Sequence, residues 1–269
     1  MKIISQNESI LLRIIDENEL DIFTFDSLFQ KLKSQIQLTY PTLNQSLQPT
    51  IEALVKRGLL SRIEKGKYCK HTFRNPYVIA NLLVPEGVVA YWSALNLHGL
   101  TSQFTNTIFV QSPKLKRNKE VFGVSYQFVK VKASKMSGIT TSGYGNNAFR
   151  MTNLEKTLVD CFDLPAYSGG VAELIVALSK AKLNNDRLIE ATRAVDNIAV
   201  IKRLGFLLEL LEKESMGKFL KYAQQCVKHI YNINVLDPST EEQGVFNRRW
   251  NLRINIDEQM IVSMSKSQY

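Results

Sequence analysis

The segment at residues 152–163 concentrates ionisable side chains on one predicted helix. Glu155, Lys156 and Asp160 are residue types that bind metal ions or transfer protons. Glu155 and Lys156 are adjacent and point to different sides of a helix, whereas Lys156 and Asp160 have the i, i+4 spacing of an ion pair. We therefore expect a structural polar cluster here. An enzyme acting on nucleic acid or nucleotides through these residues is the alternative.

Other motifs of catalysis or metal binding are missing. The sequence contains no Walker loop, no glycine-rich dinucleotide turn after a strand, and neither HExxH nor GxSxG. Cys69-x-His71 and Cys226-x-x-His229 resemble halves of a zinc site but lack the usual spacing. His98, next to Gly99, is expected to bond backbone. The sequence thus predicts no enzyme, no metal and no cofactor.

Basic residues gather between Lys56 and Arg74, opposed only by Glu64. Such a concentration suits the phosphates of a DNA duplex. The predicted phosphate contacts are Lys56, Arg57, Arg62, Lys65, Lys67 and Lys70. Four polar residues lie just before these cations in the sequence and are of types that can bond base edges or phosphates. They are predicted to contact DNA: Asn44, Gln45, Gln48 and Thr50.

Apolar spacing predicts the elements that position these residues. One amphipathic helix opens near Ser9, and a second follows an N-cap at Thr24 or Asp26. A third begins near Ser46, because Pro49 is tolerated in a first turn, and ends at Gly58. A hairpin around Lys65-Gly66 follows. This pattern predicts a winged helix-turn-helix, with a protein-contact module as the alternative.

The rest of the chain predicts a larger mixed domain, so the fold class is α+β, with domains at 1–75 and 76–269. A helix capped by Asn75-Pro76 leads into it, and another spans 88–100. Strand-like runs lie at 108–110, 121–131 and 148–151, and helices dominate after 152. A last strand at 250–256 is expected to return to the middle sheet. The basic loop 114–119 is interpreted as solvated, with an auxiliary phosphate contact left open.

The composition is typical of a globular protein, and its positive net charge suits a nucleic-acid partner. The 269 residues are 45% hydrophobic and carry a net charge of +9. The odd number of cysteines, 3, favours a reducing compartment over a disulfide framework. The N-terminus lacks a signal-peptide pattern and no stretch is long and apolar enough to span a bilayer, so a cytoplasmic location is expected.

Three segments resemble the AbiEi family, the antitoxins of type IV (abortive-infection) toxin–antitoxin systems. Residues 58–68 resemble the wing of that family, with a Gly-Leu start and a basic-Gly-x-Tyr end. Residues 91–100 resemble its Ser-Ala-Leu and His-Gly-Leu helix, which includes Ser93 and His98. Residues 152–170 resemble its Glu-Lys-Thr-Leu-Val-Asp segment and glycine pair.

The resemblance implies an N-terminal winged helix and a C-terminal antitoxin domain, in which Ser93, His98, Glu155, Lys156 and Asp160 form a structural motif. It implies binding to inverted repeats of double-stranded DNA in the chain's own promoter, with dimerisation on DNA as a possibility. It also implies a nucleotidyltransferase-like toxin that is countered without a stable complex. A transcriptional regulator without a toxin partner is the nearest alternative.

Overall fold

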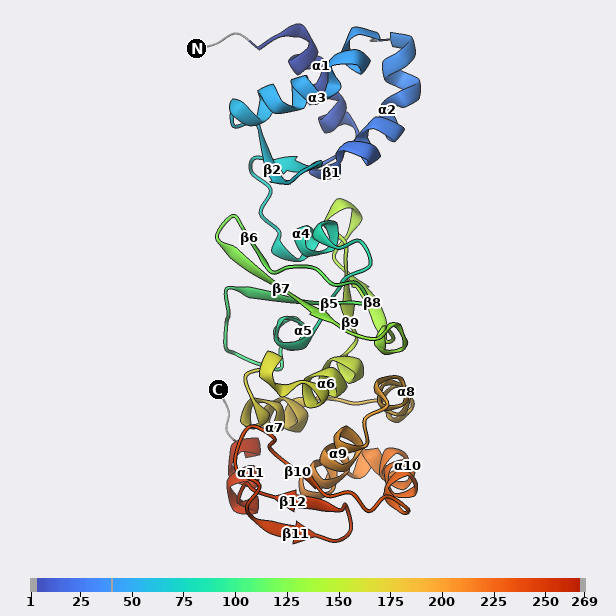
Figure 1. The fold of residues 1–269 in the computed structure, drawn as a ribbon, viewed down its shortest axis with the longest axis vertical. Helices are drawn as coiled ribbons and strands as arrows, with labels where there is room; N and C mark the ends of the chain where they lie inside the picture. Colours follow the sequence, from blue (N-terminus) through green and yellow to red (C-terminus); the bar gives the residue numbers. More distant parts are fainter. Residues whose placement is uncertain (1–3, 40, 267–269) are drawn as a thin grey trace. The chain divides into compact units, whose positions relative to one another are not determined.

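The computed structural model describes residues 4–39 and 41–266, without the side chains of residues 34–45. The chain is α+β and forms two compact units (Figure 1). The first comprises Met1–Pro85, Val121–Gly123 and Ser142–Phe149, and the second comprises Glu86–Glu120, Val124–Thr141 and Arg150–Tyr269. Each unit has a hydrophobic core of its own.

The first unit is a winged helix-turn-helix. Its helices are α1 (Gln6–Glu17), α2 (Phe25–Thr39) and α3 (Pro41–Lys56). The wing is the antiparallel hairpin of β2 (Leu60–Glu64) and β3 (Lys67–Lys70), and β1 (Ile22–Thr24) pairs with β3 as a third strand. The helices and the wing share one apolar core, which includes Leu11, Leu28, Ile51, Leu54 and Tyr68.

The helix starts follow local capping chemistry. α1 begins at Gln6, earlier than the predicted Ser9, because Ser5 and Glu8 form a reciprocal capping box. The predicted cap at Thr24 is confirmed, since its hydroxyl accepts from the Ser27 amide at 2.9 Å. The predicted start of α3 near Ser46 is wrong: the helix begins at Pro41 and contains Pro49. Loss of one backbone donor at Pro49 is tolerated in a helix that buries Leu47, Ile51 and Leu54.

The first unit extends past the predicted boundary at residue 75. The helix α4 (Pro76–Leu83) has the predicted Asn75 cap and belongs to this unit, which continues to Pro85. Lys67 donates to the Leu83 carbonyl at 2.9 Å, and Tyr77 stacks on Phe149 with ring centroids 5.1 Å apart. The first contact ties α4 to the wing, and Phe149, the partner in the second contact, also belongs to the first unit.

The middle of the chain forms a six-stranded sheet in the order β6-β7-β5-β4-β9-β8. Its strands are β4 (Val88–Val89), β5 (Thr107–Ser112), β6 (Lys119–Val121), β7 (Val124–Lys130), β8 (Ile139–Ser142) and β9 (Phe149–Thr152). β5 runs parallel to β7 and antiparallel to β4. The predicted helix over 88–100 is wrong at its start, because the β-branched pair Val88–Val89 joins the sheet and α5 spans Tyr91–Leu97.

Helices dominate the remainder of the second unit, as predicted. They are α6 (Leu154–Asp163), α7 (Val171–Lys180), α8 (Asn185–Val195), α9 (Ile198–Leu210), α10 (Gly217–Val227) and α11 (Glu258–Lys266). Short 3-10 turns lie at η1 (Ala133–Lys135), η2 (Gly145–Asn147), η3 (Pro165–Tyr167) and η4 (Glu214–Met216). None of the helices within the described ranges has the length and apolar character needed to cross a membrane.

The last strand does not return to the middle sheet, so that prediction is wrong. β12 (Leu252–Ile254) lies between β10 (Asn234–Val235) and β11 (Val245–Asn247) in a separate three-stranded sheet. Trp250 is fully buried and its indole donates to Glu209 at 2.8 Å. This anchor, with buried Leu252 and Ile254, fixes the segment on the helical core instead.

Candidate nucleic-acid interface

The polar face of α3 lies beside the wing. Leu47, Ile51 and Leu54 point into the core, whereas Pro49 and Glu52 are exposed and Gln48 is half-buried. A groove of about 630 Å³ separates this face from the hairpin and from the start of α2. Its lining consists of Thr24, Phe25, Asp26, Gln48, Glu52, Arg62, Lys65, Gly66, Lys67 and Tyr68.

Of the predicted base contacts whose side chains are described, Gln48 lies in this groove and Thr50 does not. Gln48 lines it, with its amide nitrogen donating to Glu52 Oε1 at 2.8 Å and to the Tyr68 hydroxyl at 3.1 Å. Thr50 is buried and donates to the Ser46 carbonyl at 2.8 Å, so its prediction as a base contact is wrong. The side chains of Asn44 and Gln45 lie outside the described residues.

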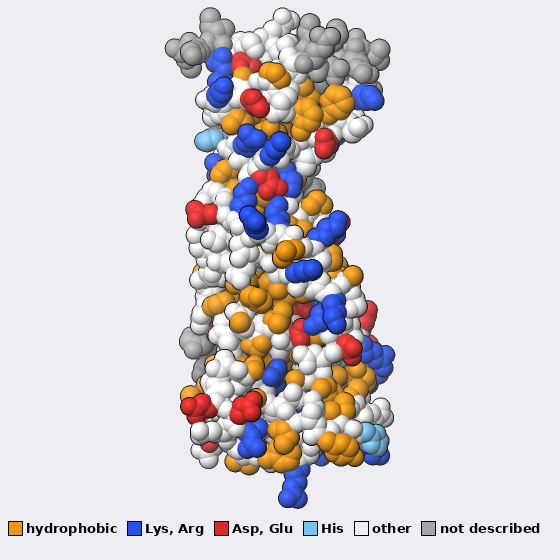
Figure 2. Space-filling model, in the orientation of Figure 1, with side chains coloured by type: hydrophobic (Ala, Val, Ile, Leu, Met, Phe, Trp, Pro, Cys, Tyr) orange, Lys and Arg blue, Asp and Glu red, His pale blue; other side chains and the backbone are white. Residues whose placement is uncertain are grey.

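Three predicted phosphate contacts are free cations. Lys56, Arg62 and Lys65 are exposed and form no ion pair with any residue that the structure describes. Gly66 has a φ of +74°, which closes the hairpin turn and leaves Lys65 at its tip. Figure 2 shows Lys and Arg side chains over the hairpin of the first unit.

The other predicted phosphate contacts are bonded inside the unit. Arg57 Nε lies 3.1 Å from Glu8, and Lys67 Nζ lies 2.7 Å from Glu64. Lys70 Nζ lies 2.8 Å from Asp16 and 3.1 Å from Asp21.

These internal ion pairs make the three cations less available to phosphates. The hydrogen bond to Asp16 raises the pKa of Lys70, and the Ser5 amide lowers the pKa of the Glu8 carboxyl. A phosphate contact by Arg57, Lys67 or Lys70 would have to compete with these bonds.

Glu52 also lines the groove and is not among the contacts predicted from the sequence. It lies one turn after Gln48 and on the side of α3 opposite the buried Leu54. The i, i+4 spacing from Gln48 is visible in the sequence, but an acidic side chain is not of a type that binds phosphates.

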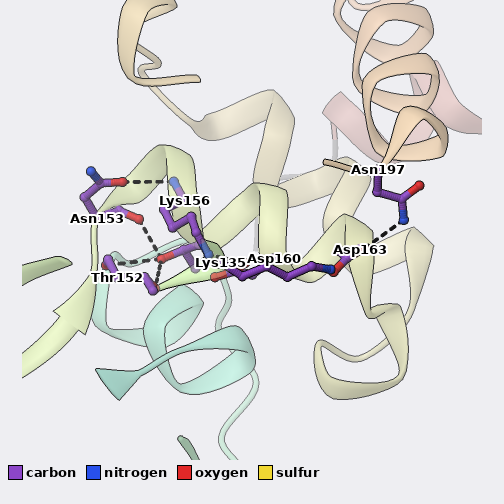
Figure 3. A network of polar contacts seen from close by, with 8 residues as sticks. Lys135, Thr152, Asn153, Lys156, Asp160, Asp163 and Asn197 are labelled. Atoms are coloured by element: carbon purple, nitrogen blue, oxygen red, sulfur yellow. Dashed lines mark hydrogen bonds and ion pairs between the residues drawn. The ribbon is translucent and has the colours of Figure 1, made fainter. Parts of the chain in front are cut away.

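The acidic cluster of the second unit is an internal polar network (Figure 3). Lys156 is fully buried and pairs with Asp160, as predicted from their spacing. Asn153 caps the helix by accepting from the Lys156 amide at 2.9 Å. Glu155 accepts from the Asn184 amide at 2.8 Å, which joins α6 to the start of α8. Burial raises the pKa of Asp160 to about 6, against the opposing effect of Lys156.

A second pair extends this network. Lys135 contacts Asp163 Oδ2 at 2.5 Å, and the Asn197 amide donates to Asp163 Oδ1 at 2.7 Å (Figure 3). The network therefore joins the 3-10 turn η1, α6 and the start of α9. Most of its polar groups bond one another, which is the arrangement expected of a structural cluster, whereas Glu155 Oε2 and Asp160 Oδ2 are buried without a hydrogen-bond partner among the described residues.

The remaining motif residues also bond backbone. The Ser93 hydroxyl accepts from the Phe109 amide at 2.9 Å, and His98 Nε2 lies 2.9 Å from the Thr152 carbonyl. In the Cys69-x-His71 segment, His71 Nδ1 lies 3.0 Å from the Ser61 hydroxyl. Burial raises the pKa of the Cys69 thiol to about 11, which disfavours the thiolate that zinc requires. Within the described ranges no cluster of metal-ligand side chains occurs.

The basic loop between β5 and β6 is exposed and partly engaged. Lys114 pairs with Glu86 at 2.6 Å, and Lys116 lies 5.6 Å from the centre of the Phe128 ring. Arg117 is exposed beside them. These contacts fit the interpretation of a solvated loop and leave the auxiliary phosphate contact open.

Comparison with known proteins gives a fold likeness. No protein-family model and no curated protein matches the sequence. The crystal structure of the RV2827C protein from Mycobacterium tuberculosis is similar with a TM-score of 0.64 at 15% identity. The match covers 98% of this chain and 96% of that one, so the likeness concerns the architecture of the whole chain.

Proposed function

We propose that this chain is a DNA-binding autorepressor and the antitoxin of a type IV toxin–antitoxin system, acting in the cytoplasm without catalysis. The observation that carries the DNA-binding part is the placement of Arg62 and Lys65. Both are exposed, lack an ion pair with a described residue, and line the groove beside the polar face of α3. Free cations next to a recognition helix suit a duplex backbone.

In this proposal α3 enters the major groove while the wing follows the backbone. Gln48 faces base edges, and Lys56, Arg62 and Lys65 neutralise phosphates. Binding to inverted repeats upstream of its own gene would place two copies on one operator. Repression of its own transcription follows from that position.

The antitoxin part rests on the resemblance of residues 91–100 and 152–170 to the AbiEi family. In the second unit Ser93, His98, Glu155, Lys156 and Asp160 bond backbone or one another, which fits their proposed role as a structural motif. The partner in this proposal is a nucleotidyltransferase-like toxin, countered without a stable complex.

Burial argues against the enzyme alternative. Glu155, Lys156 and Asp160 are 2%, 0% and 2% exposed, so a substrate could not reach them without opening α6. An acid–base group must come within hydrogen-bond distance of the proton that it transfers.

A reporter gene behind the chain's own upstream DNA tests the proposal. Wild-type protein should repress the reporter, and the double variant Arg62→Ala/Lys65→Ala should lose most of this repression. Lys182→Ala/Arg187→Ala, which removes two exposed cations from the second unit, is the matched control and should repress normally. Equal repression by all three proteins would contradict DNA binding through the wing.

Co-expression with the neighbouring gene tests the antitoxin part. If that gene arrests growth, the wild-type chain should restore it. Repression without any rescue of growth would leave a transcriptional regulator and refute the antitoxin role.

A further inference from the structure

Glu52 places a carboxylate on the exposed face of α3. It lines the same groove as Arg62 and Lys65, and it forms no ion pair with a described residue. A negative charge on a face that meets phosphates weakens binding to every sequence alike. Its presence there is therefore better suited to selecting a sequence than to increasing affinity.

The amide of Gln48 has a fixed orientation. A carboxylate only accepts hydrogen bonds, so the Gln48 nitrogen must face Glu52, at 2.8 Å. The same nitrogen donates to the hydroxyl of Tyr68 at 3.1 Å, and the Tyr68 side chain is buried in the core. Both N–H groups of Gln48 are thereby used, which leaves its Oε1 as an acceptor.

The middle of α3 consequently presents acceptors. These are the Gln48 carbonyl oxygen and the free oxygen of the Glu52 carboxylate. In the major groove, the donors are the N4 amino group of cytosine and the N6 amino group of adenine. Guanine and thymine offer acceptor oxygens to the same position and would repel a carboxylate.

Cytosine fits a carboxylate better than adenine does. Adenine carries the N7 acceptor next to its N6 donor, so the second carboxylate oxygen would face a lone pair. Glutamine makes the bidentate contact to adenine, but the Gln48 N–H groups are already bonded.

We propose that Glu52 is a specificity-determining residue that selects cytosine in the major groove, with Gln48 held as a second acceptor beside it. This inference rests on the proposed DNA-binding function. Glu52 accepts a hydrogen bond from cytosine N4. The Tyr68 hydroxyl holds the Gln48 amide against the wing, and Gln48 in turn orients the Glu52 carboxylate.

A panel of operator duplexes tests this, after the operator has been located in the upstream DNA. Each base pair is changed in turn, and binding is measured for wild type, Glu52→Gln, Glu52→Asp and Gln48→Ala. Glu17→Gln is the control, because Glu17 is an exposed carboxylate of the same unit on α1. Thermal unfolding of each variant checks that it is folded.

Wild type should lose about 10- to 100-fold in affinity when one cytosine is replaced. Glu52→Gln should lose this preference and bind unrelated DNA more tightly, because a negative charge is removed. Glu52→Asp keeps the charge but shortens the side chain, so it should lose the preference without that gain. Gln48→Ala removes the hydrogen bond that orients the Glu52 carboxylate, so it should weaken the cytosine preference. Glu17→Gln should keep it.

An unchanged base preference in both Glu52 variants would overturn the inference while leaving the proposed function intact. Wild-type protein without any sequence preference would instead refute the proposed function. A loss of the preference in Glu17→Gln would also overturn the inference, since it would make the effect one of general charge.

Discussion

Some charged side chains in this protein are bonded inside a unit, and others are exposed without an ion pair to a described residue. Lys156 and Asp160 are buried together, and Glu8 is held by Ser5 and Arg57. Arg62 and Lys65 are exposed and form no ion pair with a described residue. Removing a charge from the first kind should cost stability, and removing one from the second kind should change DNA binding.

Glu8→Gln should destabilise the protein by about 1 kcal/mol at pH 7, because the capping box and the ion pair to Arg57 are weakened. The Ser5 amide holds the pKa of the Glu8 carboxyl below its ordinary value in the folded protein, so the carboxylate stabilises the fold at pH values above that ordinary pKa. This stabilisation is lost as the pH falls through the folded pKa. Chemical denaturation across this range measures it. A difference from wild type that persists after Glu8 is protonated would argue against an ionic contribution.

Lys156→Ala should destabilise the protein by about 3–5 kcal/mol, because it leaves Asp160 buried without its counter-ion. Lys218→Ala is the matched control, since Lys218 pairs with Asp186 on the surface and its loss should cost about 0–1 kcal/mol. Denaturant unfolding gives both values. Equal small losses would mean that the buried network contributes little to the fold.

At the scale of elements, the distance between a helix backbone and the side chains packed against it decides which residues the helix tolerates. Gly205 lies in α9 against the Trp250 ring, and a Cβ built there would be 2.2 Å from a ring carbon. Helix propensity alone would make alanine more stable by about 1 kcal/mol. The clash is with a buried indole that donates to Glu209, so the indole cannot move without losing that bond.

Gly205→Ala should therefore lower the unfolding free energy by about 1–3 kcal/mol despite the better propensity. Gly217→Ala is the control, because Gly217 has helical angles and open space at its Cβ position. Thermal unfolding of the two variants compares them directly. A Gly205→Ala protein as stable as the control would show that the Trp250 packing adjusts freely.

Elements with local signals were predictable from the sequence. The hairpin around Gly66, the Asn75 cap and the Lys156–Asp160 pair follow from turn chemistry, capping and helical spacing. The partners of a strand are not a local property. Leu252 and Ile254 alternate as a strand should, but Trp250 and its contact with Glu209 decide which sheet they join.

The same limit applies to the candidate site. Basic residues from Lys56 to Lys70 could be located in the sequence, but their partners could not. Lys70 is paired with Asp16 and Asp21, which are distant in sequence, and Arg57 with Glu8. Thr50 has a polar side chain, which led to its prediction as a base contact. It lies on a turn of α3 that packs inward, so it is buried.

For the whole molecule, the net charge of +9 exceeds what the wing can present to DNA. Part of the wing's charge is used to hold the first unit together, and the second unit contains paired cations of its own. The proposal therefore assigns sequence-specific binding to a small set of free cations and to α3, with the second unit responsible for the antitoxin activity.

The affinity of the purified protein for its own upstream DNA, measured at several salt concentrations, tests this account most directly. We predict binding at least about a thousandfold tighter than to unrelated DNA. We also predict that Arg62→Ala/Lys65→Ala lowers the salt slope by about two units for each bound copy. Equal affinity for both DNAs, with a salt slope that the double variant leaves unchanged, would contradict it.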